Sequence, residues 1–257
     1  MPGFQLLMTP GDTVYRYDGS LAGFYCCVHA CVYGRELPFA IFSDAEPQMS
    51  LLFPRRIKTD RDQALRVREA VLRKISPRAL ELCEHVFLTC MEGKELALVR
   101  FLALGFREGA RVTSFLADPL VSPLMEAEQH LLGEAHLLSG FLRFEDTGGR
   151  LVAAISPKNF VLPLLAPHFA DRYAEEAFLI CDRTHRVALV YANGQAQLVE
   201  AEDGLISAPS QTELYYQQLW KRFYKTVAIK GRENPLCRRT HMPKRYWGNM
   251  AEMREWT

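Results

Sequence analysis

The sequence lacks a hydrophobic run long enough to cross a membrane. Its apolar stretches, Asn159 to Ala170 among them, stay short of the roughly 20 residues that a transmembrane helix needs. The N-terminus carries neither the basic region nor the long apolar region of a secretory signal. These absences predict a cytoplasmic protein without a membrane partner.

The sequence also lacks the cysteine spacing of a metal site. Its seven cysteines are scattered and odd in number, and no export signal accompanies them, which indicates a reducing compartment. Cys26, Cys27 and Cys31 lie closest together, but structural zinc and iron–sulfur sites normally use four ligands, and no second cysteine pair is present. We therefore predict that these thiols pack in a core, and we expect no cofactor.

Familiar catalytic motifs are missing as well. There is no G-x-S-x-G nucleophile turn, no P-loop, no G-x-G-x-x-G and no zinc-deaminase pattern. The sequence therefore names no catalytic residue.

One helical spacing resembles a ligand set. Glu126, His130 and Glu134 recur at intervals of one helical turn, as ligands do in carboxylate-bridged helix bundles. Such bundles repeat the pattern on several helices, and this chain has no second copy. We predict a solvated helix face instead.

Charge is nearly balanced overall but uneven along the chain. The formal net charge is +1. Residues 215–250, called the basic segment below, hold nine Lys or Arg and one acid, Glu233, which gives 9 − 1 = +8. The same segment holds seven aromatic residues. A basic, aromatic-rich stretch on an otherwise acidic chain is a candidate contact for a polyanion.

Hydrophobic periodicity predicts an α+β fold. Apolar residues recur at helical spacing in five segments, each of which predicts a helix. These helices are expected to begin at or just after Ser20, Thr59, Ser76, Lys94 and Ser122. Thr13 to Gly19 is typical of a strand closed by a turn. Beyond Gly140 the pattern becomes strand–strand–helix–strand–strand–strand, which predicts an antiparallel sheet with several packed helices to one side.

The C-terminal part follows a linker predicted at Gly204 to Pro209. Ser210 and Glu213 form an S-x-x-E capping box that opens the last clear helix. We expect an α+β body over residues 1–205, with a basic, aromatic-rich helical extension over residues 206–257 packed on it.

The basic segment ends in the richest run of candidate binding residues. Guanidinium groups bind phosphates bidentately, and exposed aromatic rings stack on unpaired bases. The candidate nucleic-acid-binding residues are Arg232, Arg238, Arg239, His241, Lys244, Arg245, Tyr246 and Trp247. The alternative is that Tyr246 and Trp247 are buried anchors and that the arginines pair with acids of the body.

The same run carries a resemblance to a known family. It reads LWKRFYKTVAIKGRENPLCRRTHMPKRYWGNM, and further matches are YRYDGSLAGFYCCV, KTDRDQALRV, EAHLLSGFLRF, and LPLLAPHFADRY followed by FLICDRTHRVALVY. These blocks resemble a bacterial family of DNA-metabolism or repair proteins of unestablished mechanism. Members are typically encoded beside a radical-SAM protein, and in some a related domain is fused ahead of a uracil-DNA glycosylase-like domain.

The resemblance implies a role in DNA metabolism with a radical-SAM protein as partner. This chain has no C-x-x-x-C-x-x-C cluster motif and is therefore expected to be the accessory partner. Family positions with side chains capable of function are His136, Arg143, His168, Arg172 and Asp182 in the body, and Arg232, Asn234, His241, Arg245 and Trp247 in the extension.

Three hypotheses remain open at this point. The first is an accessory protein that binds DNA, with single strands favoured, and assists its radical-SAM partner. The second is a DNA-processing enzyme of glycosylase or lyase type, with His168 or Asp182 as the acid–base group. The third is a protein scaffold whose extension is structural. A pocket that joins His136, His168 and Asp182 would favour the enzyme, and a flat basic surface with an exposed Trp247 would favour DNA binding.

Overall fold

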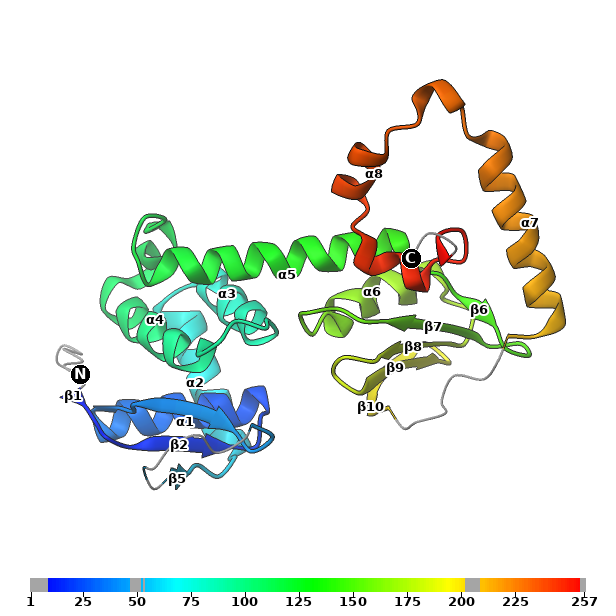
Figure 1. The fold of residues 1–257 in the computed structure, drawn as a ribbon. Coiled ribbons are helices and arrows are strands. Elements are labelled where there is room, and N and C mark those ends of the chain that lie inside the picture. Colours follow the sequence, from blue (N-terminus) through cyan, green and yellow to red (C-terminus); the bar gives the residue numbers. More distant parts are fainter. Residues whose placement is uncertain (1–8, 47–51, 53, 202–208, 255–257) are drawn as a thin grey trace. The chain divides into compact units, whose positions relative to one another are not determined.

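A computed structural model describes residues 9–46, 52, 54–201 and 209–254. The chain forms two compact units, residues 1–131 and 132–257. The boundary lies inside one long helix, α5 (Val121–Phe141) (Figure 1). The division that we expect after residue 205 is a different one and stays a prediction, and the linker expected at Gly204 to Pro209 lies almost wholly outside the described residues.

The first unit combines short parallel strands with helices. Its elements before α5 are β1 (Thr9–Pro10), β2 (Val14–Tyr17), α1 (Leu21–Gly34), β3 (Glu36–Leu37), β4 (Ala40–Ser43), β5 (Pro54–Arg56), α2 (Arg61–Lys74), α3 (Pro77–Phe87), α4 (Lys94–Glu108) and the 3₁₀ helix η1 (Gly109–Ser114). Strand β2 is the centre of a three-stranded sheet and pairs in parallel with β4 and β5, while β1 pairs in parallel with β3.

Local capping explains where the helices of this unit begin. The Oγ of Ser20 accepts a hydrogen bond from the Gly23 N–H at 2.9 Å, which confirms the predicted start of α1. Helix α2 begins one residue later than predicted, because Asp60 caps it through the Gln63 N–H. Thr59 instead donates its hydroxyl to the Asp18 carboxylate at 2.6 Å.

The three neighbouring cysteines of α1 lie in the core of the first unit. Cys26, Cys27 and Cys31 are at most 1% exposed, so the prediction of core packing is confirmed. Burial raises the pKa of the Cys31 thiol to about 12, and the charges of nearby Glu36 and Arg55 act on it in opposite directions. The thiol is therefore protonated at neutral pH.

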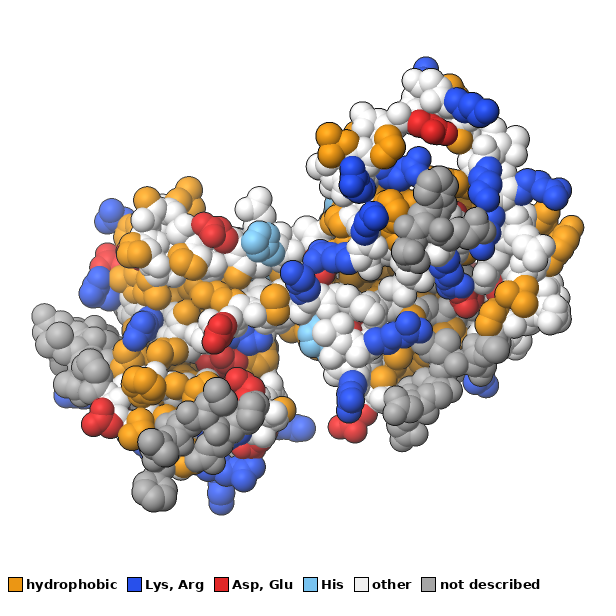
Figure 2. Space-filling view, viewed as in Figure 1, with side chains coloured by type: hydrophobic (Ala, Val, Ile, Leu, Met, Phe, Trp, Pro, Cys, Tyr) orange, Lys and Arg blue, Asp and Glu red, His pale blue; other side chains and the backbone are white. Residues whose placement is uncertain are grey.

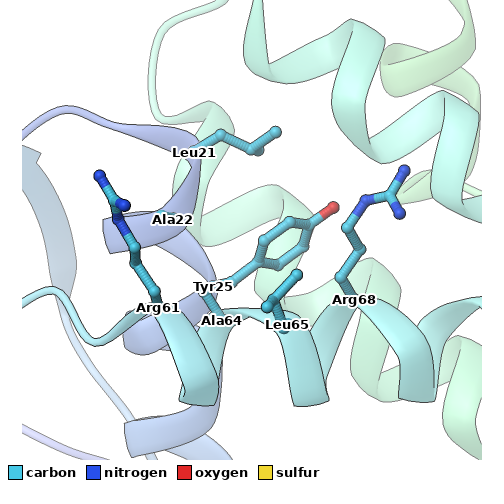
Figure 3. Close-up of a pocket in the computed structure, with 7 residues that line it drawn as sticks. All are labelled: Leu21, Ala22, Tyr25, Arg61, Ala64, Leu65 and Arg68. Carbon is cyan, nitrogen blue, oxygen red and sulfur yellow. The ribbon is translucent and has the colours of Figure 1, made fainter.

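An open apolar groove of about 310 Å³ lies between α1 and α2 (Figure 3). Its lining is Leu21, Ala22, Tyr25, Arg61, Ala64, Leu65 and Arg68. The Arg68 Nε donates to the Glu84 carboxylate at 2.7 Å. None of the residues predicted to bind nucleic acid lies in this groove.

The second unit contains a five-stranded sheet and the C-terminal helices. After the end of α5, its elements are β6 (Glu145–Asp146), β7 (Leu151–Ile155), α6 (Leu162–Arg172), β8 (Phe178–Asp182), β9 (Val187–Ala192), β10 (Gln195–Glu200), α7 (Gln211–Val227), η2 (Lys230–Arg232), α8 (Pro235–His241) and η3 (Lys244–Asn249). The α+β class is confirmed.

The predicted antiparallel sheet is wrong in one pair of strands. The strand order is β10-β9-β8-β7-β6, and β7 pairs with β8 in parallel, whereas the other three pairs are antiparallel. Helix α6 connects β7 to β8 and returns the chain to the end of the sheet where β7 began, which makes the pair parallel. The sheet is therefore mixed, and the sheet of the first unit is parallel throughout its described strands.

No helix in the described part of the chain is long and apolar enough to span a bilayer.

Candidate nucleic-acid interface

Helix α7 begins just before the basic segment, and its first turn is attached to the sheet. The Ser210 Oγ accepts the Glu213 N–H at 3.0 Å, which is one half of the predicted capping box. The Glu213 carboxylate accepts the backbone N–H of Asp146 at 3.1 Å and the side-chain amide of Gln217 at 2.9 Å. This carboxylate therefore holds α7 to β6.

The apolar stripe of α7 is exposed. The exposed fractions are 61% for Tyr216, 43% for Trp220, 55% for Phe223 and 54% for Val227, and no residue of α7 is buried. We expect this helix to pack on the body, but its apolar stripe does not take part in such packing. Tyr224 is the residue of α7 that packs against the cluster formed by the buried side chains of Trp247, Met250 and Met253.

Two rings of this stripe form an exposed platform. The Trp220 and Phe223 rings are stacked, with centroids 5.7 Å apart and an interplanar angle of 26°. Lys221, Arg222 and Lys225 belong to the same turns of α7. Proteins that bind single-stranded nucleic acids combine exposed aromatic rings with cationic side chains in this way.

Tyr246 and Trp247 are buried at the other end of the basic segment. Their exposed fractions are 3% and 5%, and the Trp247 indole N–H donates to the Met242 carbonyl at 2.9 Å. The Tyr246 ring lies 5.8 Å from that of Phe141, centroid to centroid. Their burial favours the alternative interpretation, in which Tyr246 and Trp247 are anchors, and leaves little ring surface on which a base could stack.

Arg245 is part of the same anchor. Its Nη2 lies 3.2 Å from Oε1 of Glu134, and its guanidinium lies over the Tyr246 ring at 4.7 Å. Glu134 also accepts the N–H groups of Lys158 (3.0 Å) and Asn159 (2.8 Å) and the Asn159 side-chain amide (2.7 Å). This carboxylate therefore ties α5, the turn after β7 and η3 together.

The solvated face predicted for Glu126, His130 and Glu134 is therefore wrong at its last position. Glu126 and His130 are exposed, but Glu134 is 3% exposed. Residue 134 lies one turn from both Leu131 and Leu138, which are buried on the core side of α5. That spacing is the sequence signal that could have identified Glu134 as a buried residue.

The remaining predicted residues lie along η2, α8 and the start of η3. Arg232, Arg239, His241 and Lys244 are exposed, and Arg238 is partly exposed. The imidazole Nδ1 of His241 is 3.0 Å from the Cys237 carbonyl oxygen of its own helix, and the Lys244 ammonium lies 5.6 Å from the Trp247 ring. The structure thus separates exposed cations from the anchor.

Four cations of the basic segment have no carboxylate partner among the described residues. They are Arg222, Lys230, Arg232 and Arg239. In Figure 1 this part of the chain leaves the sheet beside β6, runs through α7 and α8, and returns to η3. Figure 2 shows Lys and Arg side chains gathered over it on the second unit. Such a surface attracts polyanions.

The three residues proposed for an enzymatic site have no contact with one another in the described residues. His136 and His168 are exposed. Asp182 is fully buried, and its carboxylate accepts the N–H groups of Thr184 (2.9 Å) and His185 (3.1 Å) and lies 2.6 Å from the His185 imidazole. Asp182 therefore holds the turn between β8 and β9.

Other family positions also have structural contacts. Arg143 donates to the buried Glu252 carboxylate at 2.9 Å, and the Asn234 side chain caps α8 through the Cys237 N–H at 2.9 Å. The Arg172 guanidinium lies 5.8 Å from the Tyr173 ring. These residues stabilise the second unit and its C-terminal segment.

The fold and site define an α+β protein with an exposed basic C-terminal segment anchored at both ends. Residues 92–252 match the family described as Domain of unknown function (DUF4130). This match covers more than half of the chain, so the protein belongs to that family. No curated protein and no solved structure matches the chain.

Proposed function

We propose that the protein binds nucleic acid through the basic segment and prefers single strands. The observation that carries this proposal is the exposed Trp220–Phe223 platform on a segment of net charge +8. Stacking of a base on such a ring contributes about 1–3 kcal/mol, and a duplex hides its base faces. The platform takes over the stacking role predicted for Tyr246 and Trp247.

We further propose that this binding serves DNA metabolism or repair, with a radical-SAM protein as partner. The resemblance described above supports this role. The exposed stripe of α7 and its cations lie outside the anchor, so DNA contact leaves the packing of Tyr246, Trp247 and Arg245 intact.

A salt series tests the phosphate contacts. If five cations meet phosphates, the slope of log K against log salt is about −3.5 for single strands and about −4.5 for duplex. Fluorescence anisotropy with labelled oligonucleotides measures both slopes. Absence of binding at low salt would contradict the proposal.

Arg232→Gln with Arg239→Gln tests which cations are used. The double variant is expected to bind about 30- to 60-fold more weakly near 0.1 M salt and to flatten the slope by about 1.4 to 1.8. Arg73→Gln with Arg111→Gln removes the same charge from exposed positions of the first unit and serves as the control. Equal losses in the two double variants would show that net charge, and not the basic segment, governs binding.

Trp220→Ala with Phe223→Ala tests the stacking platform. We expect the preference for single strands over duplex to fall about tenfold or more, since two stacking surfaces are lost while the slope stays unchanged. Phe39→Ala with Leu116→Ala is the control, because both side chains are 67% exposed in the first unit. An unchanged preference would contradict the assigned role of the platform.

A further inference from the structure

A second basic surface lies in the first unit, outside the residues that match the family and far in sequence from the basic segment. It is a depression of about 490 Å³, called the basic depression below. It lies where α1, β5 and the first turn of α2 meet, and its lining is Cys26, His29, Ala30, Tyr33, Gly34, Arg55, Arg56, Ile57, Lys58 and Gln63. None of these residues is acidic.

One wall of the basic depression is a stacked pair of rings. His29 and Tyr33 are one turn apart on α1, and their ring centroids are 4.2 Å apart with an interplanar angle of 30°. Tyr33 is 78% exposed, so an accessible ring borders the depression. Burial and the charge of Arg66 lower the pKa of His29, and Asp60 offsets this in part. This shift favours the neutral form of the imidazole.

The cations of the basic depression come from β5 and the residues after it. Arg55 and Lys58 are exposed. Arg56 is partly neutralised, because its Nη2 lies 2.5 Å from the Asp44 carboxylate. Asp60, the acid whose charge reaches His29, is engaged in capping α2 through the Gln63 N–H. Arg55 and Lys58 are thus the best candidates to hold an anion.

We propose that the basic depression binds a nucleotide, with its phosphate on Arg55 and Lys58 and its base on the Tyr33 ring. An accessible ring and two exposed cations line the same depression, and a nucleotide carries both a flat ring and a phosphate. The volume is in the range of small-molecule sites, and the Gln63 amide offers donors and an acceptor to a base edge. Inorganic phosphate would use only the cations. The site requires no contribution from the basic segment.

The nucleotide is either a free mononucleotide or one unit of a strand, and the experiment distinguishes the two. The full chain is titrated with thymidine 5′-monophosphate, 5′-phosphorylated tetrathymidylate, thymidine and inorganic phosphate. Binding is followed by NMR on the His29 imidazole signal, assigned with His29→Gln. We expect a Kd of about 1 mM or below for at least one of the two phosphorylated thymidine ligands, and weaker binding of thymidine and phosphate.

Substitutions in the basic depression test whether the nucleotide binds there. Tyr33→Ala and the pair Arg55→Gln with Lys58→Gln are each expected to weaken nucleotide binding about tenfold, whereas Tyr33→Phe keeps the ring and the affinity. Phe39→Ala and Arg111→Gln are matched controls, because these exposed residues lie outside the depression. Arg232→Gln with Arg239→Gln is expected to leave the His29 response unchanged, which separates this site from the basic segment.

Each outcome decides the proposal. Response to the monophosphate assigns a free nucleotide, and response to tetrathymidylate alone assigns a unit of a strand. The proposal is overturned if neither ligand shifts the His29 signal, if phosphate alone binds as tightly, or if the Tyr33→Ala and Arg55/Lys58 variants bind like the wild type.

Discussion

Glu134→Ala is expected to lower the free energy of unfolding of the second unit by about 3 kcal/mol. The wild-type carboxylate is 3% exposed and accepts three hydrogen bonds from Lys158 and Asn159 in addition to the ion pair with Arg245. Alanine removes this acceptor from all three donors and from Arg245. Because η3 is held through Arg245, the C-terminal anchor is expected to loosen as well.

Hydrogen exchange measured on peptides of the second unit reports the local opening free energy. Glu126→Ala on the same helix is the control and should change stability by less than about 0.5 kcal/mol, since residue 126 is exposed. Glu134→Gln keeps one acceptor oxygen and should fall between wild type and Glu134→Ala. Protection of residues 244–253 that is equal in Glu134→Ala and wild type would show that the anchor does not depend on Glu134.

Arg78→Met is expected to destabilise the first unit by about 2 kcal/mol at neutral pH, because a buried carboxylate loses its hydrogen bonds from a partly exposed guanidinium. Arg78 Nη1 donates to Glu128 Oε1 at 2.6 Å, and the Glu128 side chain is 4% exposed. His85 Nδ1 lies 2.8 Å from the same oxygen and is the remaining partner in the variant. Loss of the guanidinium leaves a buried carboxylate with one partner of the original two.

The stability that the Arg78–Glu128 ion pair contributes should fall at acidic pH. Burial raises the pKa of Glu128, but the hydrogen bonds from Arg78 and His85 outweigh it, so the folded-state pKa lies below the ordinary value of 4.5. The resulting stabilisation is complete above pH 4.5 and is lost as the pH falls through the lower folded-state pKa. The stability difference between wild type and Arg78→Met should therefore shrink below pH 4.5.

Urea unfolding from pH 7 to pH 3, followed by circular dichroism, measures this difference. Arg73→Met is the control, because Arg73 pairs with the exposed Glu69 on the helix surface and its loss should have little effect. A difference between wild type and Arg78→Met that grows on acidification would rule out the ion pair as its cause.

Local signals allowed much of the secondary structure to be predicted. Ser20, Ser76 and Ser210 precede helices in the sequence and cap them in the structure, because a short hydroxyl side chain satisfies an N–H of the first turn. The adjacent glycines 148 and 149, a pair typical of a hairpin turn, adopt positive φ angles between β6 and β7. These signals act over three or four residues and need no knowledge of the rest of the fold.

Strand pairing was harder to predict because it depends on distant segments. Strand β4 has four residues and no regular alternation, and β5 has three exposed residues, yet both pair with β2. Whether β7 and β8 run parallel depends on the path of α6 over the sheet, which no residue of either strand specifies. The prediction of an antiparallel sheet failed for this reason.

The charge of the sequence predicted where the candidate site lies, whereas the burial of side chains in the structure changed which aromatic residues belong to it. Counting basic and acidic residues along the sequence is enough to find the basic segment. Most of its predicted cations are exposed. Composition could not distinguish Trp220, which is 43% exposed, from Trp247, which is 5% exposed. That difference arises from the fold, since Trp247 packs against Met250 and Met253 whereas no described residue of α7 is buried.

The chain is attached to the second unit at Glu213, just before the basic segment, and again at Arg245 within it, which has a consequence for variation among relatives. A chain fixed at two points is a closed loop, and the entropy of closing it grows only with the logarithm of its length, about 0.6 kcal/mol for each doubling. Residues inserted or deleted between α7 and α8 therefore cost little stability while both attachments persist. The spacing of the cations can change in this way without any change in the sheet.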